Sequence, residues 1–489
     1  MDELARCWDE VPRRLEDVPG GRQAFGATVR QKDLRLPGGR EEIPGLKRLL
    51  VRRRRDDERT HRSIEPGPLG RCPPALASAL EWYTSLVRTR REFLRASARL
   101  VPAIVGGGLC GQALRGFAAA DTLHDDLLAT APIARYWTSV ERAGVECTAC
   151  HDRALLARGE THAHPPGLVR CFLCANGCSI KVGGRGECGT RLNVGGELRS
   201  LVYGRPLAVH IDPIEKKPFY HFLPGSEAFS LGTAGCPLHC RFCQNWQLSQ
   251  ARPEDHSTPF VVPRALVAAA KTSGSPVIAF TYNEPTIQAE YITDVAGEAQ
   301  REGIRSVIVS CGFMTEVPLA DLCGVLAAVK IDLKGFSPGF YREVCRADLK
   351  PVLRSIAQVA RRRVHLELVN LVVPTLNDSP ALLEGLADWV MGEVGPDVPV
   401  HFTRFHPDYQ LQNLPPTPIA TLERAREIAM GKGIRFAYVG NVPGHPGNNT
   451  YCPGCGRVVI ARSNFFVTDL ELEAGRCRYC HRAIPGVWS

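Results

Sequence analysis

The stretch "AFSLGTAGCPLHCRFCQNW", from Ala228 to Trp246, joins an apolar strand to a loop that holds three cysteines. Cys236, Cys240 and Cys243 follow C-x3-C-x2-C spacing. A structural zinc site takes four ligands, and disulfides take cysteines in pairs. Three thiolates can instead hold three irons of a four-iron, four-sulfur cluster and leave the fourth iron open to another molecule.

Apolar strands alternate with helices after this loop. The further strands are predicted at residues 276–282, 305–311, 327–333, 365–373, 399–405 and 435–440, with helices at 286–302, 349–362, 381–393 and 419–432. Such alternation is typical of a parallel sheet built of βα units. Six or seven units in about 215 residues favour a full or partial (β/α) barrel. No G-x-G-x-x-G follows the first strand, which argues against a nicotinamide enzyme.

The other strand-to-helix loops carry polar residues at the barrel end where chemistry is expected. Asn283 and Glu284 follow the second strand, and Asp332 and Lys334 end the fourth. Later loops add Asn370, Asn377, Asp378, Arg404, His406 and Asp408. Each can face a substrate, or serve as a solvated loop residue or helix cap.

Two sets of four cysteines flank the predicted barrel. The first has C-x2-C-x3-C-x9-C spacing at Cys171, Cys174, Cys178 and Cys188, and predicts zinc or a second iron–sulfur cluster. The second is Cys452, Cys455, Cys477 and Cys480, two C-x2-C pairs around β-rich sequence, and predicts a zinc ribbon. The alternative for both sets is reduced thiols without metal.

The remaining cysteines are less regular. Cys147, Cys150 and His151, with His162 and His164 nearby, form a partial or accessory ligand set. The isolated ones are interpreted as small buried apolar residues: Cys7, Cys72, Cys110, Cys311, Cys323 and Cys345.

Basic charge is concentrated at the start of the chain. Residues 1–99 hold 22 of the 60 Lys and Arg but only 15 of the 51 Asp and Glu, so the remainder is nearly neutral. A neutral catalytic region does not present a broad phosphate-binding surface, and no nucleic-acid partner is expected. Residues 1–87 are Arg-, Pro- and Gly-rich, and we expect a poorly ordered extension, or a mis-called start with translation beginning near Val87.

Residues 88–122 follow the order of a twin-arginine export signal. Arg90 and Arg91 precede an apolar stretch and small residues. An amphipathic surface helix is the alternative. We expect the protein to work in the cytoplasm, with twin-arginine export as the open alternative.

C-x3-C-x2-C on the first strand-to-helix loop, with Phe242 before the last cysteine, resembles the radical S-adenosylmethionine (radical SAM) superfamily. The linked motifs resemble the AmmeMemoRadiSam system enzymes, relatives of pyruvate formate-lyase activating enzymes: "LVYGRPLAVHIDPIEKKPFYHFLPGS", "CQNW", "YNEPT", "VGNVPG" and a terminal "CPGC…CRYC…IPGVW". This resemblance covers about Ala134 to the C-terminus. The Cys147–His164 stretch departs from the pattern.

The resemblance implies a fold and a set of cofactors. The fold is an α/β partial barrel of the radical SAM type over 225–443, with an N-terminal Cys-rich module at 131–205 and a zinc-ribbon-like module at 446–489. A 4Fe-4S cluster on the three loop cysteines would cleave SAM to a 5′-deoxyadenosyl radical that abstracts hydrogen. Phe242, Asn283, Glu284 and Asp332 are the expected SAM contacts.

The implied function leaves the substrate open. A low-potential electron donor and a small-molecule or protein substrate are expected, and the resemblance implies AMMECR-like and Memo-like partner proteins. A glycyl-radical-enzyme activase is an alternative. A non-catalytic iron–sulfur or zinc scaffold for electron transfer is another.

Overall fold

The computed structural model describes residues 125–139, 165–362 and 364–489. All the described residues belong to one compact unit. The predicted extension at 1–87, the export-like segment at 88–122 and the stretch from Cys147 to His164 lie outside the described residues.

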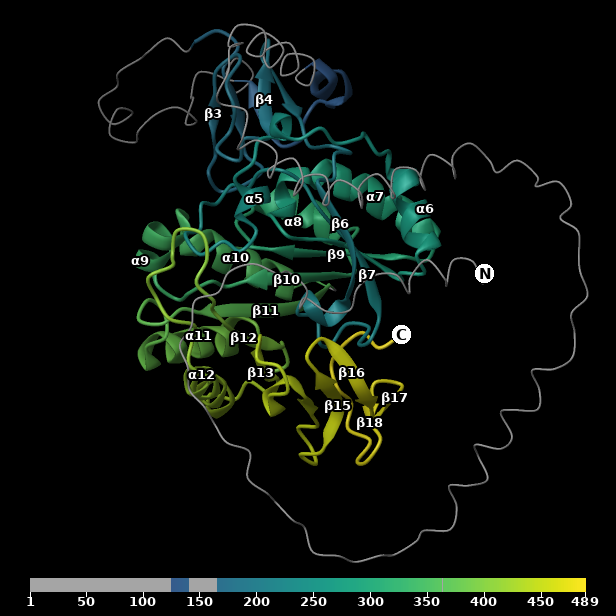
Figure 1. The fold of residues 1–489 in the computed structure, drawn as a ribbon, viewed down its shortest axis with the longest axis vertical. Coiled ribbons are helices and arrows are strands. Elements are labelled where there is room, and N and C mark those ends of the chain that lie inside the picture. Colours follow the sequence, from purple (N-terminus) through teal and green to yellow (C-terminus); the bar gives the residue numbers. More distant parts are fainter. Residues whose placement is uncertain (1–124, 140–164, 363) are drawn as a thin grey trace, which may run out of the picture. The chain divides into compact units, whose positions relative to one another are not determined.

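An eight-stranded sheet forms the centre of the described chain (Figure 1). Strands β7 to β13 are parallel and lie in sequence order, and β6 pairs antiparallel with β7 at one edge. The sheet is open, with β6 and β13 at its edges. The strands are β6 (Ala208–Pro213), β7 (Glu227–Gly232), β8 (Val277–Phe280), β9 (Arg305–Ser310), β10 (Ala328–Asp332), β11 (His365–Val372), β12 (Val400–Arg404) and β13 (Ala437–Gly440).

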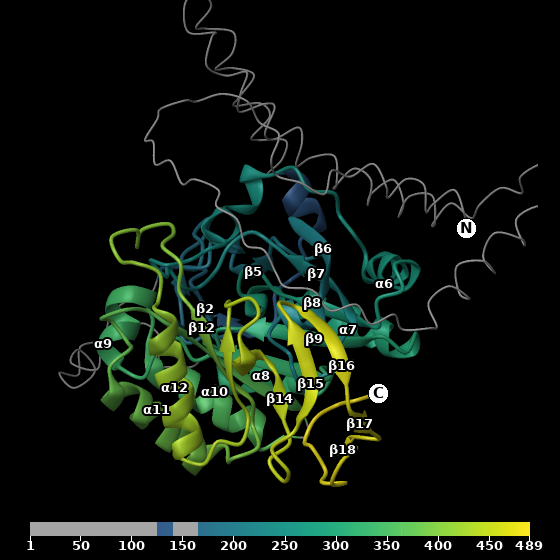
Figure 2. The same cartoon turned by 60° about the horizontal axis from the view of Figure 1, so that its bottom comes forward.

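Helices connect successive parallel strands and cover one face of the sheet (Figures 1 and 2). Proline stands at the first turn of α6 and α11, where a missing N–H costs nothing. The helices are α5 (Trp246–Ser249), α6 (Pro263–Thr272), α7 (Ala289–Arg301), α8 (Glu316–Cys323), α9 (Pro338–Phe340), α10 (Leu349–Ala360), α11 (Pro380–Glu393) and α12 (Ile419–Gly431). Short 3-10 helices are η2 (Ile214–Lys216), η3 (Pro253–Asp255), η4 (Pro285–Gln288) and η6 (Pro446–Asn448), and η5 (Tyr341–Cys345) is a π-helical turn.

Alternate residues of the strands enter two different cores. Side chains such as Ile278 and Phe280 pack with the helices in the large core. Their neighbours Val277 and Ala279 belong to a smaller core with Phe219. This period of two, in strands buried on both faces, explains why the parallel strands read as continuous apolar runs.

The structure confirms the predicted α/β partial barrel and its seven parallel strands. Strand β6 was not predicted, because His210 and Asp212 interrupt its apolar pattern. It lies before the predicted barrel range of 225–443 but pairs with β7 along its whole length.

Two small β modules flank the sheet. The N-terminal Cys module contains β1 (Trp137–Ser139), β2 (Val169–Cys171) and β3 (Ser179–Ile180), followed by a hairpin of β4 (Arg191–Val194) and β5 (Glu197–Ser200). The C-terminal Cys module contains β14 (Thr450–Tyr451), β15 (Val458–Ser463) and β16 (Phe466–Leu470), and a hairpin of β17 (Leu472–Glu473) and β18 (Arg476–Cys477) (Figure 2).

The C-terminal Cys module docks where the parallel strands begin. Glu367, near the start of β11, is fully buried and accepts hydrogen bonds from the backbone N–H groups of Tyr220 and His221. The ring of His221 contacts the carbonyl oxygen of Pro485 at 2.6 Å, and Arg462 donates to the carbonyl oxygen of Tyr220 at 2.7 Å. These buried contacts join the module to the barrel.

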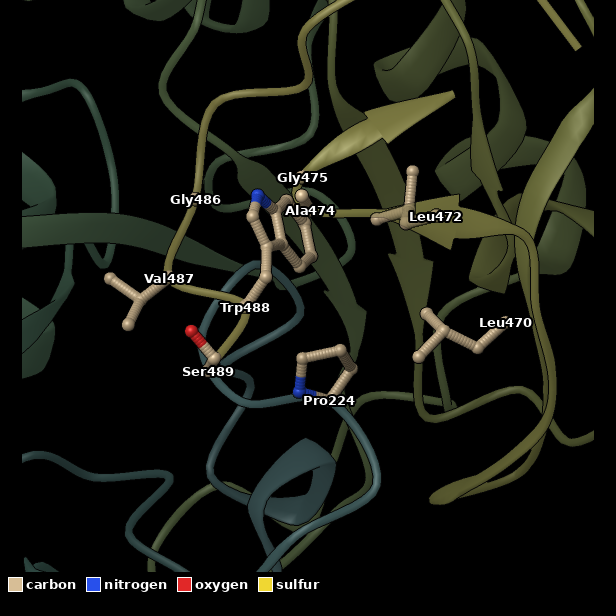
Figure 3. Close-up of a pocket in the computed structure, with 9 residues that line it drawn as sticks. All are labelled: Pro224, Leu470, Leu472, Ala474, Gly475, Gly486, Val487, Trp488 and Ser489. Carbon is tan, nitrogen blue, oxygen red and sulfur yellow. The ribbon is translucent and has the colours of Figure 1, made fainter. Parts of the chain in front are cut away.

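A pocket of about 540 Å³ lies at this junction (Figure 3). The indole of Trp488 lies beside Ala474 and Gly475, and Leu470 and Leu472 line the pocket across from it. The lining has no cysteine and no charged side chain, so this pocket offers nothing that would hold iron.

Candidate active site and metal centres

The three-cysteine loop follows β7 directly, at the end of the sheet where the parallel strands finish. Gly235 precedes Cys236 with φ of +91°, a conformation that favours glycine. A Cβ at this position would lie 2.5 Å from the carbonyl oxygen of Cys188, so only glycine fits between the loop and the N-terminal Cys module. On its other side the loop donates from Arg241 N–H to the carbonyl oxygen of Val344 in η5.

The loop thiols lie within or close to the core. Cys240 is buried, whereas Cys236 and Cys243 are partly buried. A hydrogen bond from Cys345, followed by the charge of Lys334, lowers the pKa of Cys240 against the effect of burial. Burial of Lys334 would lower its own pKa, but the charges of Asp332 and Cys240 raise it. Lys334 therefore supplies a partly buried positive charge beside this loop.

Phe242 packs in the core beneath the loop. Its ring stacks on Phe340 with centroids 6.2 Å apart, and Lys334 Nζ lies 5.8 Å from the Phe242 centroid. These contacts give Phe242 a packing role in the described structure. Its contact with SAM stays a prediction.

Asn283 and Glu284 tie neighbouring loops together. Asn283 donates to the carbonyl oxygen of Gly235 at 2.7 Å, which fixes the start of the three-cysteine loop. Glu284 is buried and accepts hydrogen bonds from Thr286 N–H, Thr286 Oγ1, Ser310 Oγ and Cys311 N–H. The carboxylate therefore clamps the ends of β8 and β9, and its contact with the SAM ammonium stays a prediction.

Asp332 ends β10 between two lysines. It forms ion pairs with Lys330 and, at 3.2 Å, with Lys334. Burial alone would raise the pKa of Asp332, but the charges of Lys330 and Lys334 lower it to about 2. Its side chain remains 28% exposed, so an ionised carboxylate is accessible near the loop.

The later predicted loop residues mostly stabilise loop structure. Asn377 donates to the carbonyl oxygens of Lys334 and Leu371, and Asn370 donates to that of Leu333. Three of the remaining four also have local partners: Asp378 with Thr375 N–H, Arg404 with the Thr417 carbonyl, and Asp408 with Tyr409 N–H. His406 is exposed.

A largely buried polar group of Tyr282, Asp212 and Lys217 was not predicted from the sequence. Tyr282 has φ of +72°, which is rare for a bulky residue and accompanies functional sites in many proteins. Its hydroxyl donates to Asp212 at 2.7 Å, and Lys217 Nζ lies 2.5 Å from the same carboxylate. Burial lowers the pKa of Lys217 to about 8. In the sequence, the signal for this group is the segment "HIDPIEKKPF", His210–Phe219, which contains Asp212 and Lys217.

Two cysteines predicted as buried apolar residues lie near the loop thiols. Cys311 and Cys345 are buried in the large core. The thiol of Cys240 lies 3.9 Å from the carbonyl oxygen of Cys345, and the charge of Cys236 acts on Cys311. Both cysteines lie in the core. Because they are close to the loop thiols, substituting them is a useful control for substitutions of the loop cysteines.

The four C-terminal cysteines converge as a mononuclear site would require. Their Sγ atoms all lie within 4.8 Å of one another, and the pairs Cys452–Cys480 and Cys455–Cys477 are 3.5 and 3.7 Å apart. Tetrahedral zinc with Zn–S bonds of about 2.3 Å places its sulfurs about 3.8 Å apart. The donor set fits one tetrahedral ion.

The N-terminal set is Cys171, Cys174, Cys178 and Cys188. Among the described residues, these thiols do not gather into a mononuclear site as the C-terminal set does. Burial alone would lower the pKa of the buried Arg191, but Glu290 and then the charges of Cys171 and Cys188 raise it. Two of the four thiols, Cys171 and Cys188, therefore lie near a buried guanidinium. Cys147, Cys150, His151, His162 and His164 lie outside the described residues.

The family model of the radical SAM superfamily matches residues 230–384, which include the end of β7, the three-cysteine loop and β8 to β11. The chain belongs to the radical SAM superfamily. This radical SAM chain is also 41% identical over 318 residues to an uncharacterized protein of Methanocaldococcus jannaschii, a match that covers 65% of this chain and 95% of that protein. Membership implies an enzyme with a 4Fe-4S cluster and SAM.

Two further comparisons are more distant. The (2S)-3-sulfopropanediol dehydratase activating enzyme of Klebsiella oxytoca is 20% identical over 112 residues, 23% of this radical SAM chain and about a third (35%) of that enzyme. A domain of a pyruvate-formate lyase-activating enzyme from Bacteroides vulgatus has a TM-score of 0.31 and 14% identity, covering 33% of this chain and 98% of that domain.

In the described ranges, no helix combines the length and apolar character needed to cross a membrane.

Proposed function

We propose that this protein cleaves SAM reductively at a 4Fe-4S cluster held by Cys236, Cys240 and Cys243. The observation that carries the proposal is the position of three thiols on one glycine-pinned loop at the C-terminal end of a parallel sheet. When bound, the cluster would supply the electron that releases a 5′-deoxyadenosyl radical from SAM, and this radical would abstract hydrogen from an unidentified substrate.

The surrounding residues prepare the site for this chemistry. Lys334 balances thiolate charge next to Cys240, and Asn283 fixes the loop through Gly235. Glu284 holds the loops after β8 and β9 in one arrangement. Asp332 is the accessible carboxylate in this group, and we propose that it faces the cationic SAM. We place the reaction in the cytoplasm, where SAM and a low-potential donor are available.

The test is anaerobic reconstitution with iron and sulfide, followed by measurement of 5′-deoxyadenosine formed from SAM with titanium(III) citrate as reductant. We expect product from the native chain and none from Cys240→Ala. Cys323→Ala, which removes a buried thiol from α8, is the matched control and should retain activity. Activity in Cys240→Ala, or none in the native chain, would overturn the proposal.

Cys345→Ala separates this proposal from a non-catalytic scaffold with four cysteine ligands. Cys345 is buried, and its carbonyl oxygen lies 3.9 Å from the Cys240 thiol. If the fourth iron is open, Cys345→Ala retains the cluster and SAM cleavage. Loss of one cluster's iron from this variant, with correct folding by circular dichroism, would support the scaffold instead.

An activase that forms a glycyl radical on a protein is the second candidate. The matched segment of the sulfopropanediol dehydratase activating enzyme favours it. The test is electron paramagnetic resonance of cell lysate fractions after incubation with the active enzyme and SAM. A SAM-dependent glycyl doublet on a protein would support this candidate, and its absence alongside substrate-dependent SAM consumption would exclude it.

We propose that Cys452, Cys455, Cys477 and Cys480 bind one structural zinc ion. The sulfur spacing of 3.5 and 3.7 Å supports this assignment. Elemental analysis of protein purified without added metal should give about one zinc per chain. Absence of zinc in the native protein would contradict it.

A further inference from the structure

We infer that Cys171, Cys174, Cys178 and Cys188 hold an iron–sulfur cluster that passes electrons to the Cys236 site. This inference rests on the proposed SAM cleavage, because that reaction consumes an electron that must reach the loop. Sequence alone left zinc and iron–sulfur open for this set. The structure separates them by the spacing of the thiols, the location of the module and its buried charge.

The thiol spacing differs from that of a zinc site. In the C-terminal Cys module two thiol pairs are within 3.7 Å. In the N-terminal set, no two of the four thiols hydrogen bond with each other in the described structure, and Cys178 accepts from Glu187 N–H instead. A multi-iron cluster binds each thiolate through a different iron and so keeps the sulfurs farther apart.

The N-terminal Cys module lies directly on the three-cysteine loop. The carbonyl oxygen of Cys188 closely approaches Gly235, the residue before Cys236. Asn176, between Cys174 and Cys178, donates to the carbonyl oxygen of Pro237 at 2.9 Å. Glu187 contacts His239 at 3.0 Å. Each contact joins a module cysteine, or a residue within two positions of one, to the three-cysteine loop. Few covalent bonds and hydrogen bonds therefore separate the module thiols from the loop thiols.

A second group of contacts fixes the module to the loop after β9. Ala175 N–H donates to the carbonyl oxygen of Phe313, and Thr315 N–H donates to that of Leu173. The backbone next to Cys174 therefore also lies close to Cys311, which neighbours Cys236. The module is attached on two sides of the site.

Buried charge around the thiols fits an anionic cluster. Arg191 is buried, pairs with Glu290 at 2.5 Å and donates to the carbonyl oxygen of Arg135. Its Nε is buried without a hydrogen-bond partner among the described residues. An unsatisfied buried donor is costly, and acceptors such as cluster sulfides would satisfy it.

The electron step is simple and balanced. A reduced low-potential flavin or iron–sulfur protein would lose one electron to the cluster held by the N-terminal Cys module. That cluster would return to its oxidised state when it reduces the cluster held by the three-cysteine loop. No bond to the polypeptide forms or breaks, and no proton is transferred. The donor is therefore expected to dock on the N-terminal Cys module.

The first test counts and identifies metal in full-length protein reconstituted anaerobically with iron and sulfide. We expect about eight irons per chain in the native protein and about four in a Cys236→Ala/Cys240→Ala/Cys243→Ala variant, with a 4Fe Mössbauer signal remaining in the variant. Cys174→Ala/Cys188→Ala should lose that remaining signal. Zinc in the N-terminal set, or no iron left after removing the three loop cysteines, would overturn the inference.

The second test compares electron delivery. The 5′-deoxyadenosine rate is measured with reduced flavodoxin and with titanium(III) citrate, in native protein, Cys174→Ala/Cys188→Ala and the control Cys323→Ala. We expect the ratio of flavodoxin-driven to chemically driven rate to fall about tenfold or more in the double variant and to stay constant in the control. An equal fall in both rates, or an unchanged ratio, would contradict a relay. No product from native protein with either reductant would instead refute the proposed function.

Discussion

The N-terminal and C-terminal Cys modules each carry four cysteines, at opposite ends of one sheet. The N-terminal set lies on the loops that follow β7 and β9, next to the site of chemistry. The C-terminal set lies where β11 to β13 begin, over a buried network centred on Glu367. The two sets therefore share one ligand type and differ in how their thiols converge and in where they lie on the sheet, and our two proposals depend on these differences.

The two modules are also held to the barrel by different kinds of interaction. The N-terminal Cys module depends on a buried ion pair between Arg191 and Glu290 and on close backbone contact at Gly235. The C-terminal Cys module shares a core with the barrel, in which Tyr220, Phe436 and Tyr438 pack against Val459 and Ile460. Each attachment can be weakened separately.

The largest expected effect is loss of the C-terminal metal. Cys477→Ala should remove zinc and unfold the module, because structural zinc contributes about 10 kcal/mol or more to the folding of small domains. Metal analysis and thermal unfolding measure the effect. Cys323→Ala, another buried thiol, is the control. Normal unfolding of Cys477→Ala with no zinc bound would show that the module does not depend on metal.

Next comes the buried ion pair of the N-terminal Cys module. Arg191→Met leaves Glu290 buried without its partner and should lower the free energy of unfolding by about 3–5 kcal/mol. Arg191→Met/Glu290→Leu removes both charges and should recover much of this loss. Denaturant unfolding of both variants measures it. Equal destabilisation by the two variants would mean that the charge pair itself is not the cause.

A smaller effect is expected where the N-terminal Cys module meets the loop. Gly235→Ala places a methyl group against Cys188 and Thr190, whereas Gly274→Ala has a similar positive φ and open space around it. Gly235→Ala should cost about 1–3 kcal/mol more than Gly274→Ala because of this overpacking. If denaturant unfolding finds the same cost at both sites, the module does not press on the loop.

The smallest effect is the acid sensitivity of the C-terminal junction. Burial lowers the pKa of His221 to about 3 from an ordinary 6.5, against the charge of Glu367. Between these values the unfolded chain binds more protons, so stability rises with pH and is lost on acidification, by at most about 1.4 kcal/mol per pH unit. The pKa of Glu367 also lies below its usual range, so this carboxylate likewise makes the free energy of unfolding rise with pH, in a lower pH range.

His221→Gln should therefore flatten the dependence of unfolding free energy on pH between pH 5 and about 6.5. The exposed His406→Gln is the control. His221 faces Tyr438, Glu367, His365 and Arg462, and these groups remain in the variant. An unchanged slope in His221→Gln would show that this histidine is not the proton-sensitive group.

Much of this organisation could be predicted from the sequence. The seven parallel strands were found because strands buried on both faces are continuously apolar. Convergence of Cys452, Cys455, Cys477 and Cys480 followed from paired C-x2-C spacing. Strand β6 and the Tyr282–Asp212–Lys217 group could not be found, because buried charge satisfied by distant partners leaves no periodic signal. Nor could the sequence show that Arg191 reaches Glu290 across 99 residues.

SAM binding at an open iron is tested most directly by electron–nuclear double resonance on the reduced protein mixed with SAM that carries ¹⁵N in its amino group. We expect a ¹⁵N hyperfine coupling from the cluster at Cys236, Cys240 and Cys243, retained in Cys174→Ala/Cys188→Ala. A reduced 4Fe-4S cluster on the loop that shows no coupling to the labelled nitrogen would contradict SAM binding at an open iron.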